Sequence, residues 1–357
     1  MIAITSGLVA ASYDNSLTSQ IQQDVHQAIT KTRTAKSLLE LELSGASSPE
    51  VFKYVHALNN PEALKSLCNA LSALTPEELA YFDPSLQDPR YTKELSCNGS
   101  LRAKLENYWK DSRIRLERYL TEHGLASSLT SSGQERNPAS VKGALSSIEI
   151  PLRAQDNVVV SGRTKDGLLR EKQIVLTFND GPSPDRTEQL LAILKAAHVR
   201  AMFFQAGQKI RAHSDLTRKT FDAGHIIASH SMTHAILSQI GLNDAFGEID
   251  KGREQLAATT GRDNPFVRMP YGASNEELNR YLHEKGLTSF YWNMDSRDWQ
   301  TTDARELWDQ ILKELDREKG GILLMHESNA VTLVVLPYLL NELKARGYST
   351  AVFVPKN

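Results

Sequence analysis

The sequence predicts an α/β domain with a parallel sheet, preceded by an all-helical N-terminal region. Apolar residues recur at helical spacing between about residues 14 and 124. From Ser127 to about Ser147 the composition shifts to Ser, Gly, Asn and Pro, which is typical of a linker. After Ile174, strand-like and helix-like runs alternate, and repeated βα units build a parallel sheet, open or closed into a barrel. We therefore predict a helical accessory domain at 1–126, a linker at 127–147 and an α/β domain at 148–357.

The length and composition suit two domains with packed cores. The chain has 357 residues, of which 40% are hydrophobic. Its 41 Lys and Arg residues nearly balance 43 Asp and Glu residues, so no bulk charge draws it to nucleic acid or anionic lipid, and a neutral substrate fits more easily. Residues 1–11 are apolar and small, but they lack a basic flank and are too short to span a membrane. They suit either the remnant of a trimmed signal peptide or an initial strand.

Three helix starts in the N-terminal region are marked by a capping residue followed by proline. They are Ser48-Pro49-Glu50, Asn60-Pro61-Glu62 and Thr75-Pro76-Glu77-Glu78, the last with Glu78 completing a capping box. We expect a longer helix before them to end near Gly45 and a final helix to end at Gly124. The result is a small helical bundle without a catalytic constellation.

Two residue pairs in this bundle allow more than one interpretation. Tyr108 and Trp109 could stack on a sugar, but an aromatic pair at helical spacing is more typical of a core. Cys68 and Cys97 are not spaced for a metal site. The sequence leaves open whether they form one disulfide, as in an oxidising compartment, or remain free thiols.

The α/β domain is expected to open with two short strands at 148–150 and 158–160, paired as a hairpin. Further strands are predicted at 174–178, 201–204, 226–228, 266–268, 289–292, 321–325 and 350–354. Between them we predict helices at 188–197, up to Gly224, around 245–259, and at 275–285, 305–315 and 333–346.

A divalent-metal site is indicated at the end of the first of these longer strands. Asn179 and Asp180 follow a buried apolar run and precede the turn-forming pair Gly181-Pro182, so they lie at the carboxyl end of a strand, where α/β proteins place their chemistry. His230 and His234 are four residues apart, a spacing that puts both imidazoles on one face of a helical turn. One carboxylate and two neutral imidazoles leave positions open for water and substrate, as in a catalytic site.

These residues and three later motifs resemble the polysaccharide deacetylase family, the NodB-homology carbohydrate esterases of family 4. The matching motifs are Thr177-Phe178-Asn179-Asp180-Gly181-Pro182, His230-Ser231-Met232-Thr233-His234, Arg268-Met269-Pro270-Tyr271, Asp295-Ser296-Arg297-Asp298-Trp299 and Leu324-Met325-His326. The resemblance covers about residues 170–355 and selects a distorted (β/α) barrel among the parallel folds. It implies a bound metal, usually zinc, with cobalt or manganese in some relatives.

The resemblance also implies a role for each matching residue. Arg268 would tether the catalytic aspartate, and the backbone N–H of Tyr271 would help to hold the tetrahedral oxyanion. His326 would be the general acid that protonates the departing amine, oriented and kept charged by Asp298. The substrate pocket would be walled by Trp299, Leu324 and Pro270.

Asn179 departs from the family pattern, because relatives carry an aspartate there as the catalytic base. An amide is neutral and its nitrogen lone pair is delocalised, so Asn179 cannot take a proton from water. Loss of a general base typically costs about 10²- to 10⁴-fold in rate. The chain is then an engineered inactive variant, a natural member with another base, or a binding-only relative. Arg268, without its carboxylate, is expected to turn toward Asp185, Asp298 or Glu327, and Glu327 is a candidate substitute base.

The leading functional hypothesis is a metal-dependent N-deacetylase of polymers that contain N-acetylglucosamine. By the same resemblance peptidoglycan is preferred over chitin or an exopolysaccharide, with a periplasmic or secreted location. Two alternatives remain, a glycan-binding pseudoenzyme suggested by Asn179 and a hydrolase of small cyclic amides. Neither a nucleic-acid partner nor a membrane span is expected.

Overall fold

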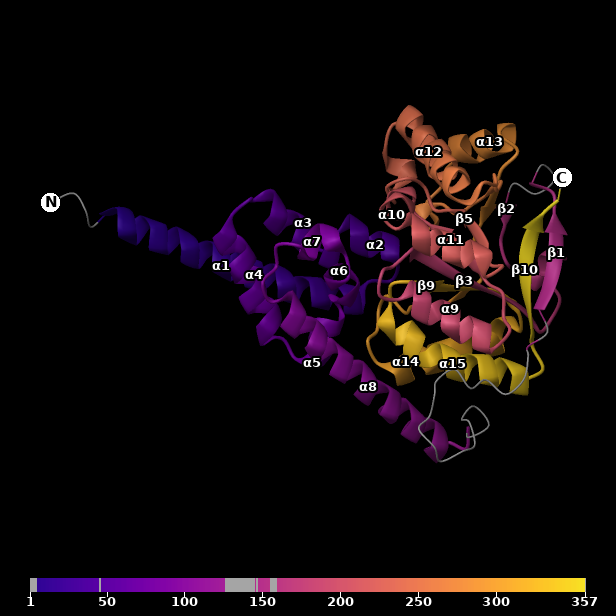
Figure 1. Cartoon of the computed structure of the whole chain (residues 1–357), viewed down its shortest axis with the longest axis horizontal. Helices are drawn as coiled ribbons and strands as arrows, with labels where there is room; N and C mark the ends of the chain where they lie inside the picture. The colour runs from indigo at the N-terminus through magenta and orange to yellow at the C-terminus, as the bar shows by residue number, and fades with distance from the viewer. Residues whose placement is uncertain (1–4, 45, 126–144, 146, 155–158, 357) are drawn as a thin grey trace. The chain divides into compact units, whose positions relative to one another are not determined.

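The computed structural model describes residues 5–44, 46–125, 145, 147–154 and 159–356. The chain divides into two compact units, which we describe separately: Met1–Asp111 with Trp299–Thr302, and Ser112–Asp298 with Asp303–Asn357 (Figure 1). A helical N-terminal region followed by a parallel α/β domain confirms the predicted fold class. Most of the predicted linker lies outside the described residues, so the domain boundaries at 126 and 148 stay a prediction. No described helix combines the length and the apolar character needed to cross a membrane.

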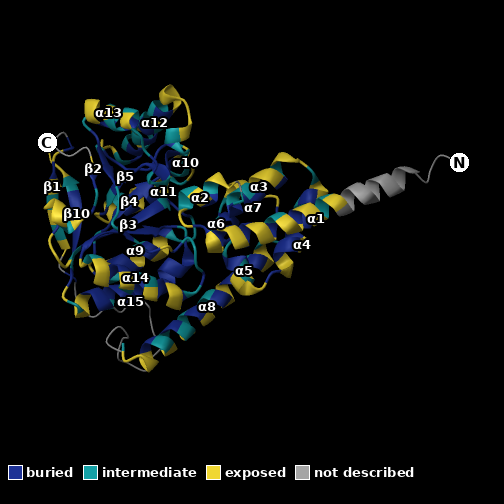
Figure 2. Ribbon diagram, turned by 180° about the vertical axis from the view of Figure 1, so that it is seen from behind, coloured by how far each residue is buried: buried dark blue, intermediate teal, exposed yellow. Residues whose placement is uncertain are grey.

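The first unit is a helical bundle around one apolar core. Its helices are α1 (Thr5–Thr34), α2 (Leu38–Leu43), α3 (Ser48–Ala57), α4 (Pro61–Ala73), α5 (Pro76–Ala80), α6 (Asp83–Leu86), α7 (Pro89–Thr92) and the first part of α8 (Asn98–Glu122). Phe52, Leu67, Leu71 and Phe82 are fully buried in the core. In Figure 2 buried and exposed residues alternate along the coloured part of α1, as expected for a helix with one face on the core.

The predicted helix starts are confirmed at α4 and α5 and are wrong in detail at α3. Asn60 accepts from the backbone N–H of Glu62, and Thr75 and Glu78 form the predicted capping box. At α3, however, Ser48 is the first helical residue; the N-cap is Ser47, whose side chain makes no capping hydrogen bond. The expected long helix toward Gly45 is also broken in two, because the Ser37 hydroxyl accepts from Glu40 N and starts α2 anew.

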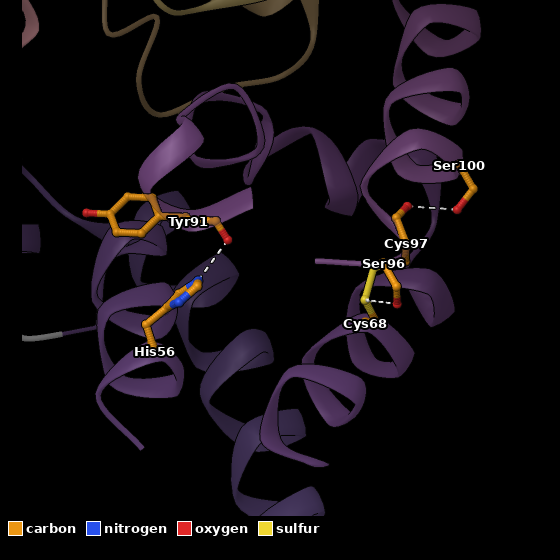
Figure 3. Close-up of a disulfide and its surroundings, with 6 residues drawn as sticks. All are labelled: His56, Cys68, Tyr91, Ser96, Cys97 and Ser100. Carbon is orange, nitrogen blue, oxygen red and sulfur yellow. Dashed lines mark hydrogen bonds between the residues drawn. A yellow bond between two sulfur atoms is a disulfide. The ribbon is translucent and has the colours of Figure 1, made fainter. Parts of the chain in front are cut away.

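The two cysteines of the bundle form a disulfide. Cys68 on α4 and Cys97, next to the start of α8, are bonded with their Cα atoms 5.7 Å apart (Figure 3). This decides between the two states that the sequence left open. The aromatic pair belongs to the core, as expected: Tyr108 is buried, and the Trp109 indole Nε1 donates to the Asp83 carboxylate at 3.1 Å.

The second unit is built on a parallel sheet. Its strands are β1 (Ser147–Leu152), β2 (Val159–Val160), β3 (Gln173–Gly181), β4 (Met202–Gln205), β5 (Ile226–Ser229), β6 (Phe266–Val267), β7 (Thr288–Phe290), β8 (Met294–Asp295), β9 (Gly321–His326) and β10 (Ser349–Pro355). The order is β1-β10-β3-β4-β5-β6-β7-β2, and β9 adds to β3 and carries β8 on its other edge. Among the described residues no ladder joins β8 to β2, so the barrel is not closed.

The expected opening hairpin is wrong. β1 pairs in parallel with β10, and β2 pairs in parallel with β7. Both partners follow far along the chain, so local sequence could not reveal them.

Helices flank the sheet as the βα alternation predicts. They are α9 (Thr187–Ala196), α10 (Gly207–Ala212), α11 (Ser214–Asp222), α12 (Leu242–Thr260), α13 (Glu276–Glu284), α14 (Ala304–Glu318) and α15 (Ala330–Ala345), with short 3-10 turns η3 (Thr164–Asp166), η4 (Leu237–Gln239) and η5 (Pro270–Gly272). Figures 1 and 2 show α9, α14 and α15 side by side. α15 is apolar and buried almost all round.

The C-terminal part of α8, from Ser112 onward, belongs to this second unit and packs on α14 and α15. Leu116 and Leu120 are fully buried. Tyr338 on α15 donates to Glu117 at 2.7 Å, and Tyr119 donates to Asp309 on α14 at 2.9 Å. These hydrogen bonds tie the C-terminal part of α8 to α14 and α15.

Candidate metal centre

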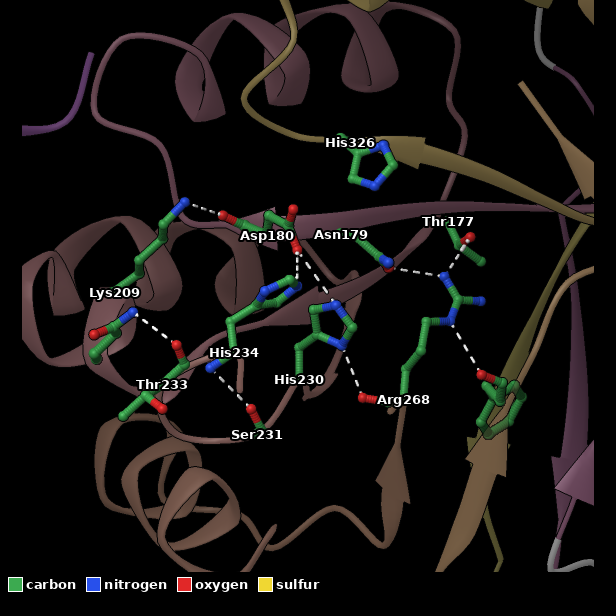
Figure 4. Close-up of polar contacts among 12 residues, drawn as sticks. Thr177, Asn179, Asp180, Lys209, His230, Ser231, Thr233, His234, Arg268 and His326 are labelled. Atoms are coloured by element: carbon green, nitrogen blue, oxygen red, sulfur yellow. Dashed lines mark hydrogen bonds and ion pairs between the residues drawn. The ribbon is translucent and has the colours of Figure 1, made fainter. Parts of the chain in front are cut away.

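The centre lies at the carboxyl ends of the parallel strands, and the last residues of β3 supply its carboxylate. Asn179 and Asp180 are near the end of β3, and Asp180 has a left-handed backbone with φ 66°. Lys209 on α10 holds this conformation by donating to the Asp180 carbonyl oxygen at 2.7 Å (Figure 4). The side chain of Asp180 is thereby turned toward the loop after β5.

That loop supplies two imidazoles, although not from a helix. The expected helical turn at 230–234 is wrong: the residues after β5 form an irregular loop in which Ser231 and His234 have φ values of 62° and 66°. Even so, Nε2 of His230 and of His234 lie 3.3 Å and 3.0 Å from Oδ1 of Asp180 (Figure 4). Two left-handed residues bring the imidazoles together. The four-residue spacing thus predicted the right pair of histidines, but the helical turn from which it was argued is not there.

The protonation states of His230 and Asp180 suit a cation. Nδ1 of His230 lies 2.7 Å from the Arg268 carbonyl oxygen, which can only accept, so Nδ1 carries the proton and the Nε2 lone pair is free. Burial lowers the pKa of His230 to about 4, so this imidazole is neutral at neutral pH. Burial alone would raise the pKa of Asp180, but the nearby histidines hold it well below its usual range, and the carboxylate is charged.

The arrangement leaves a buried oxygen without a hydrogen. Among the described residues Asp180 Oδ1 has no hydrogen-bond donor, although it faces two imidazole nitrogens. The three donor atoms lie within 4.8 Å of one another. One carboxylate oxygen and two imidazole nitrogens that converge in this way form a ligand set that fits a borderline divalent ion such as zinc. The residues present therefore fit the expected metal.

Arg268 remains on Asn179 despite the missing carboxylate. Its guanidinium donates to Oδ1 of Asn179 and to the Thr177 hydroxyl, each at 2.9 Å, and also to the carbonyl oxygens of Phe290 and Tyr291. The expectation that Arg268 turns toward Asp185, Asp298 or Glu327 is therefore wrong. All four acceptors are neutral, and burial lowers the pKa of Arg268 to about 9.

His326 and Asp298 form a buried pair at the end of β9. Nδ1 of His326 lies 2.7 Å from one oxygen of Asp298, and the other oxygen accepts from the His326 backbone N–H at 2.7 Å and from the Thr332 hydroxyl at 2.5 Å. Burial alone lowers the pKa of His326, but the charge and hydrogen bond of Asp298 outweigh it and raise that pKa to about 9. The imidazole is thus charged at neutral pH and its ring is fixed by Asp298.

The remaining predicted site residues are Tyr271, Pro270, Leu324 and Trp299. Tyr271 has a left-handed backbone with φ 60°, and its ring packs edge-on against His234 with centroids 4.7 Å apart. Pro270 on η5 and Leu324 on β9 are both buried. Trp299 belongs by its contacts to the helical unit, so its role as a pocket wall stays a prediction.

Glu327 lies behind the metal-binding turn. One carboxylate oxygen accepts from the Thr187 hydroxyl and the other from the Gln205 amide at 3.4 Å. The carboxylate also lies against Gly181, where an added Cβ would stand 1.5 Å from Oε2. Burial raises the pKa of Glu327 to about 7. Because this carboxylate is bound by Thr187 and Gln205 and by none of the metal-binding residues, the hypothesis that Glu327 replaces the missing base finds no support.

Three residues of the site were missed by the sequence analysis. The Thr177 hydroxyl accepts from Arg268, as Asn179 does. Lys209 holds the backbone of Asp180, and the Thr332 hydroxyl donates to the Asp298 carboxylate. Thr177 stands in the first motif and could have been singled out. Lys209 and Thr332 carry no motif and reach the site only through the fold.

Comparison with known proteins places the chain among deacetylases. The family model described as polysaccharide deacetylase matches residues 166–290. The chitooligosaccharide deacetylase of Rhizobium leguminosarum bv. trifolii is 31% identical over 157 residues, covering 44% of this chain and 72% of the relative. The peptidoglycan-N-acetylglucosamine deacetylase PgdA of Listeria monocytogenes is 32% identical over 177 residues, covering 50% of this chain but only 37% of the relative's length.

A solved structure resembles the whole chain. The peptidoglycan deacetylase of Bdellovibrio bacteriovorus superposes with a TM-score of 0.81 at 25% sequence identity. The superposition covers 95% of this chain and 96% of the other. The likeness therefore extends beyond the α/β domain to the helical region.

Proposed function

Because the chain belongs to the polysaccharide deacetylase family, whose members are hydrolases of acetamido groups, we propose that it is a metal-dependent N-deacetylase of glycans containing N-acetylglucosamine. We take peptidoglycan as its substrate. The Listeria and Bdellovibrio relatives are named for activity on that polymer, which supports this choice over chitin. The observation that carries the proposal is the convergence of one buried Asp180 oxygen with Nε2 of His230 and of His234, at 3.3 and 3.0 Å.

The proposed mechanism assigns one task to each group of residues. Asp180, His230 and His234 hold a divalent cation, which when bound supplies Lewis-acid chemistry to an amide carbonyl and to water. The backbone N–H of Tyr271 donates to the oxygen of the tetrahedral intermediate. His326, charged and held by Asp298, gives its proton to the departing amine.

Asn179 limits turnover in this proposal. Its oxygen accepts from Arg268, so the side chain is oriented as a base would be, but an amide cannot take up the proton that water must lose. We expect slow deacetylation by this chain, with cation and substrate binding retained.

The test is acetate release from N-acetylglucosamine oligomers and peptidoglycan fragments, measured for the chain and for Asn179→Asp after loading with zinc. Restoring the base should raise kcat by about 10²- to 10⁴-fold. Equal turnover in both proteins would show that Asn179 is not the limiting group. Absence of zinc binding by the chain would remove the proposal at its first step.

A glycan-binding pseudoenzyme is the second candidate, favoured by the same asparagine. A buried Arg268 with only neutral acceptors is what remains when a base is lost and the rest of the site is kept. In that case neither protein releases acetate, although both bind zinc and the glycan.

We also propose that the protein works outside the cytosol. The disulfide between Cys68 and Cys97 supports this, because cytosolic thiols are normally kept reduced.

A further inference from the structure

The loop between the two metal-binding histidines is tied down from outside the metal centre. Its backbone carbonyl oxygens at Ser231 and Met232 accept from the N–H groups of Gly207 and Gln208, at 2.9 and 2.8 Å. These two donors stand at the beginning of α10. One side of the loop is thus held by a helix N-terminus, and its own N–H groups must find acceptors elsewhere.

Two of those N–H groups, at Met232 and Thr233, donate to a single carboxylate on α12, while the His234 N–H donates to the Ser231 hydroxyl at 3.0 Å. One oxygen of Glu248 accepts from the backbone N–H of Met232 at 3.1 Å and of Thr233 at 2.7 Å. The other oxygen accepts from the Thr233 hydroxyl at 2.9 Å. Glu248 therefore binds two consecutive residues that lie between His230 and His234. The imidazoles of His230 and His234 contact Asp180, not Glu248.

Close packing of α12 on the loop sets the reach of this carboxylate. Gly252, one turn after Glu248, lies so near that an added Cβ would be 2.6 Å from the Ser231 carbonyl carbon. Only glycine allows the helix backbone to approach this closely. The distance between α12 and the loop is thus fixed by backbone contact, and Glu248 spans it.

The loop needs such external support because of its backbone conformation. Ser231 and His234 are both left-handed, and neither is glycine. Such residues are costly and persist only where the surroundings determine their conformation. Without its acceptors, the segment is free to relax toward ordinary backbone angles, which would turn the His234 imidazole away from Asp180.

We propose that Glu248 is a positioning residue for the metal centre: it holds the loop between His230 and His234 and thereby sets the affinity of the centre for its cation. This rests on the proposed function, since it assumes that the three side chains bind a metal. The role is geometric. A glutamine can replace the glutamate, because its oxygen accepts from both N–H groups and its amide donates to the Thr233 hydroxyl.

The experiment measures the dissociation constant for zinc alone, by competition with a chelating dye, in the full chain and its variants. Glu248→Ala should weaken zinc binding by about 10- to 100-fold, the usual effect of losing an outer partner of a metal ligand. Glu248→Gln should stay within a few-fold of the unchanged chain. Thr233→Val, which removes one of the three hydrogen bonds, should fall between them.

Glu254→Ala is the matched control, because Glu254 is an exposed glutamate on the same helix. Circular dichroism confirms that each variant is folded, and if Glu248→Ala is not, the comparison of Glu248→Gln with Thr233→Val decides. Equal affinity in Glu248→Ala and the unchanged chain overturns the proposal, as does a Glu248→Gln variant as weak as Glu248→Ala, which would assign the effect to charge. Failure of the unchanged chain to bind zinc would instead remove the proposed function.

Discussion

At the scale of single residues, the pair Arg268 and Asn179 differs from a salt bridge by one atom. The guanidinium is 1% exposed and all four of its acceptors are neutral. A buried charge without a hydrogen-bonded opposite charge is costly, and burial lowers the pKa of Arg268 although Asp180 is near enough to oppose this. The residue that blocks turnover in our proposal is thus also a weak point in stability.

Asn179→Asp should therefore stabilise the metal-free protein as well as activate the loaded one. We expect the free energy of unfolding at neutral pH to rise by about 2–4 kcal/mol, because the new carboxylate completes a buried ion pair. Urea denaturation of both proteins measures this. A fall in stability would mean that repulsion from Asp180 outweighs the attraction to Arg268.

The pair of His326 and Asp298 predicts how stability changes with pH. The folded-state pKa of His326 is raised to about 9, above an unfolded value of about 6.5. Its contribution is fully present below the unfolded pKa and is lost as the pH rises through the folded one. The unfolding free energy of the metal-free chain should fall between about pH 6.5 and 9 by an amount on the order of 3 kcal/mol.

Asp298→Asn provides the comparison, since it removes the charge that raises the pKa of His326. Its urea midpoint should be lower at pH 6.5 and should vary much less up to pH 9. Parallel curves for the two proteins would contradict the assignment of the pH dependence to this pair.

At the scale of elements, the sequence predicted most strands and helices of the α/β unit but not their partners. The alternation of apolar runs placed β3 through β5 and α12 through α15 within a few residues of their observed bounds. Strand pairing depends on residues far apart in the sequence, so the local pattern could not predict that β1 pairs with β10. The two-residue strand β8 was missed because Met294 is its only apolar residue, whereas the equally short β2 and β6 are wholly apolar.

The candidate site was predicted to a similar extent. Motif spacing identified the three residues that converge, Asp180, His230 and His234. It failed on the conformation that brings them together, because left-handed angles at Ser231 and His234 have no signature in those residue types. The predicted turn of Arg268 toward another carboxylate was also wrong, because four neutral acceptors hold the guanidinium beside Asn179.

Because the C-terminal part of α8 belongs to the α/β unit, we expect a truncated chain to need this segment for full stability. A chain that starts at residue 148 lacks Leu116 and Leu120, which are fully buried in that unit. We expect it to be less stable than a chain that starts at Ser112 by about 4 kcal/mol, and to bind hydrophobic dyes. In the full chain, Leu116→Ala with Leu120→Ala should lower the melting temperature. Equal melting temperatures for the two truncated chains would show that the C-terminal part of α8 does not stabilise the α/β unit.

At the scale of the whole molecule, the parallel sheet gathers groups that are far apart in sequence. The metal-binding residues come from the ends of β3 and β5, Arg268 follows β6, and His326 ends β9. All ladders of the sheet are parallel, so these carboxyl ends share one edge. The proposed reaction therefore depends on strands from β3 to β9, whereas the cation ligands themselves come from the ends of β3 and β5.

The position of β3 has a consequence for the newly made chain. Its neighbour on one side is β9, and β10 joins its first residues, yet both are synthesised long after it. While translation continues, β3 carries a bare, strongly apolar border that can capture other nascent strands. Ribosome-bound intermediates halted before Gly321 should thus be the species that chaperones recognise, and release should follow once the last two strands emerge.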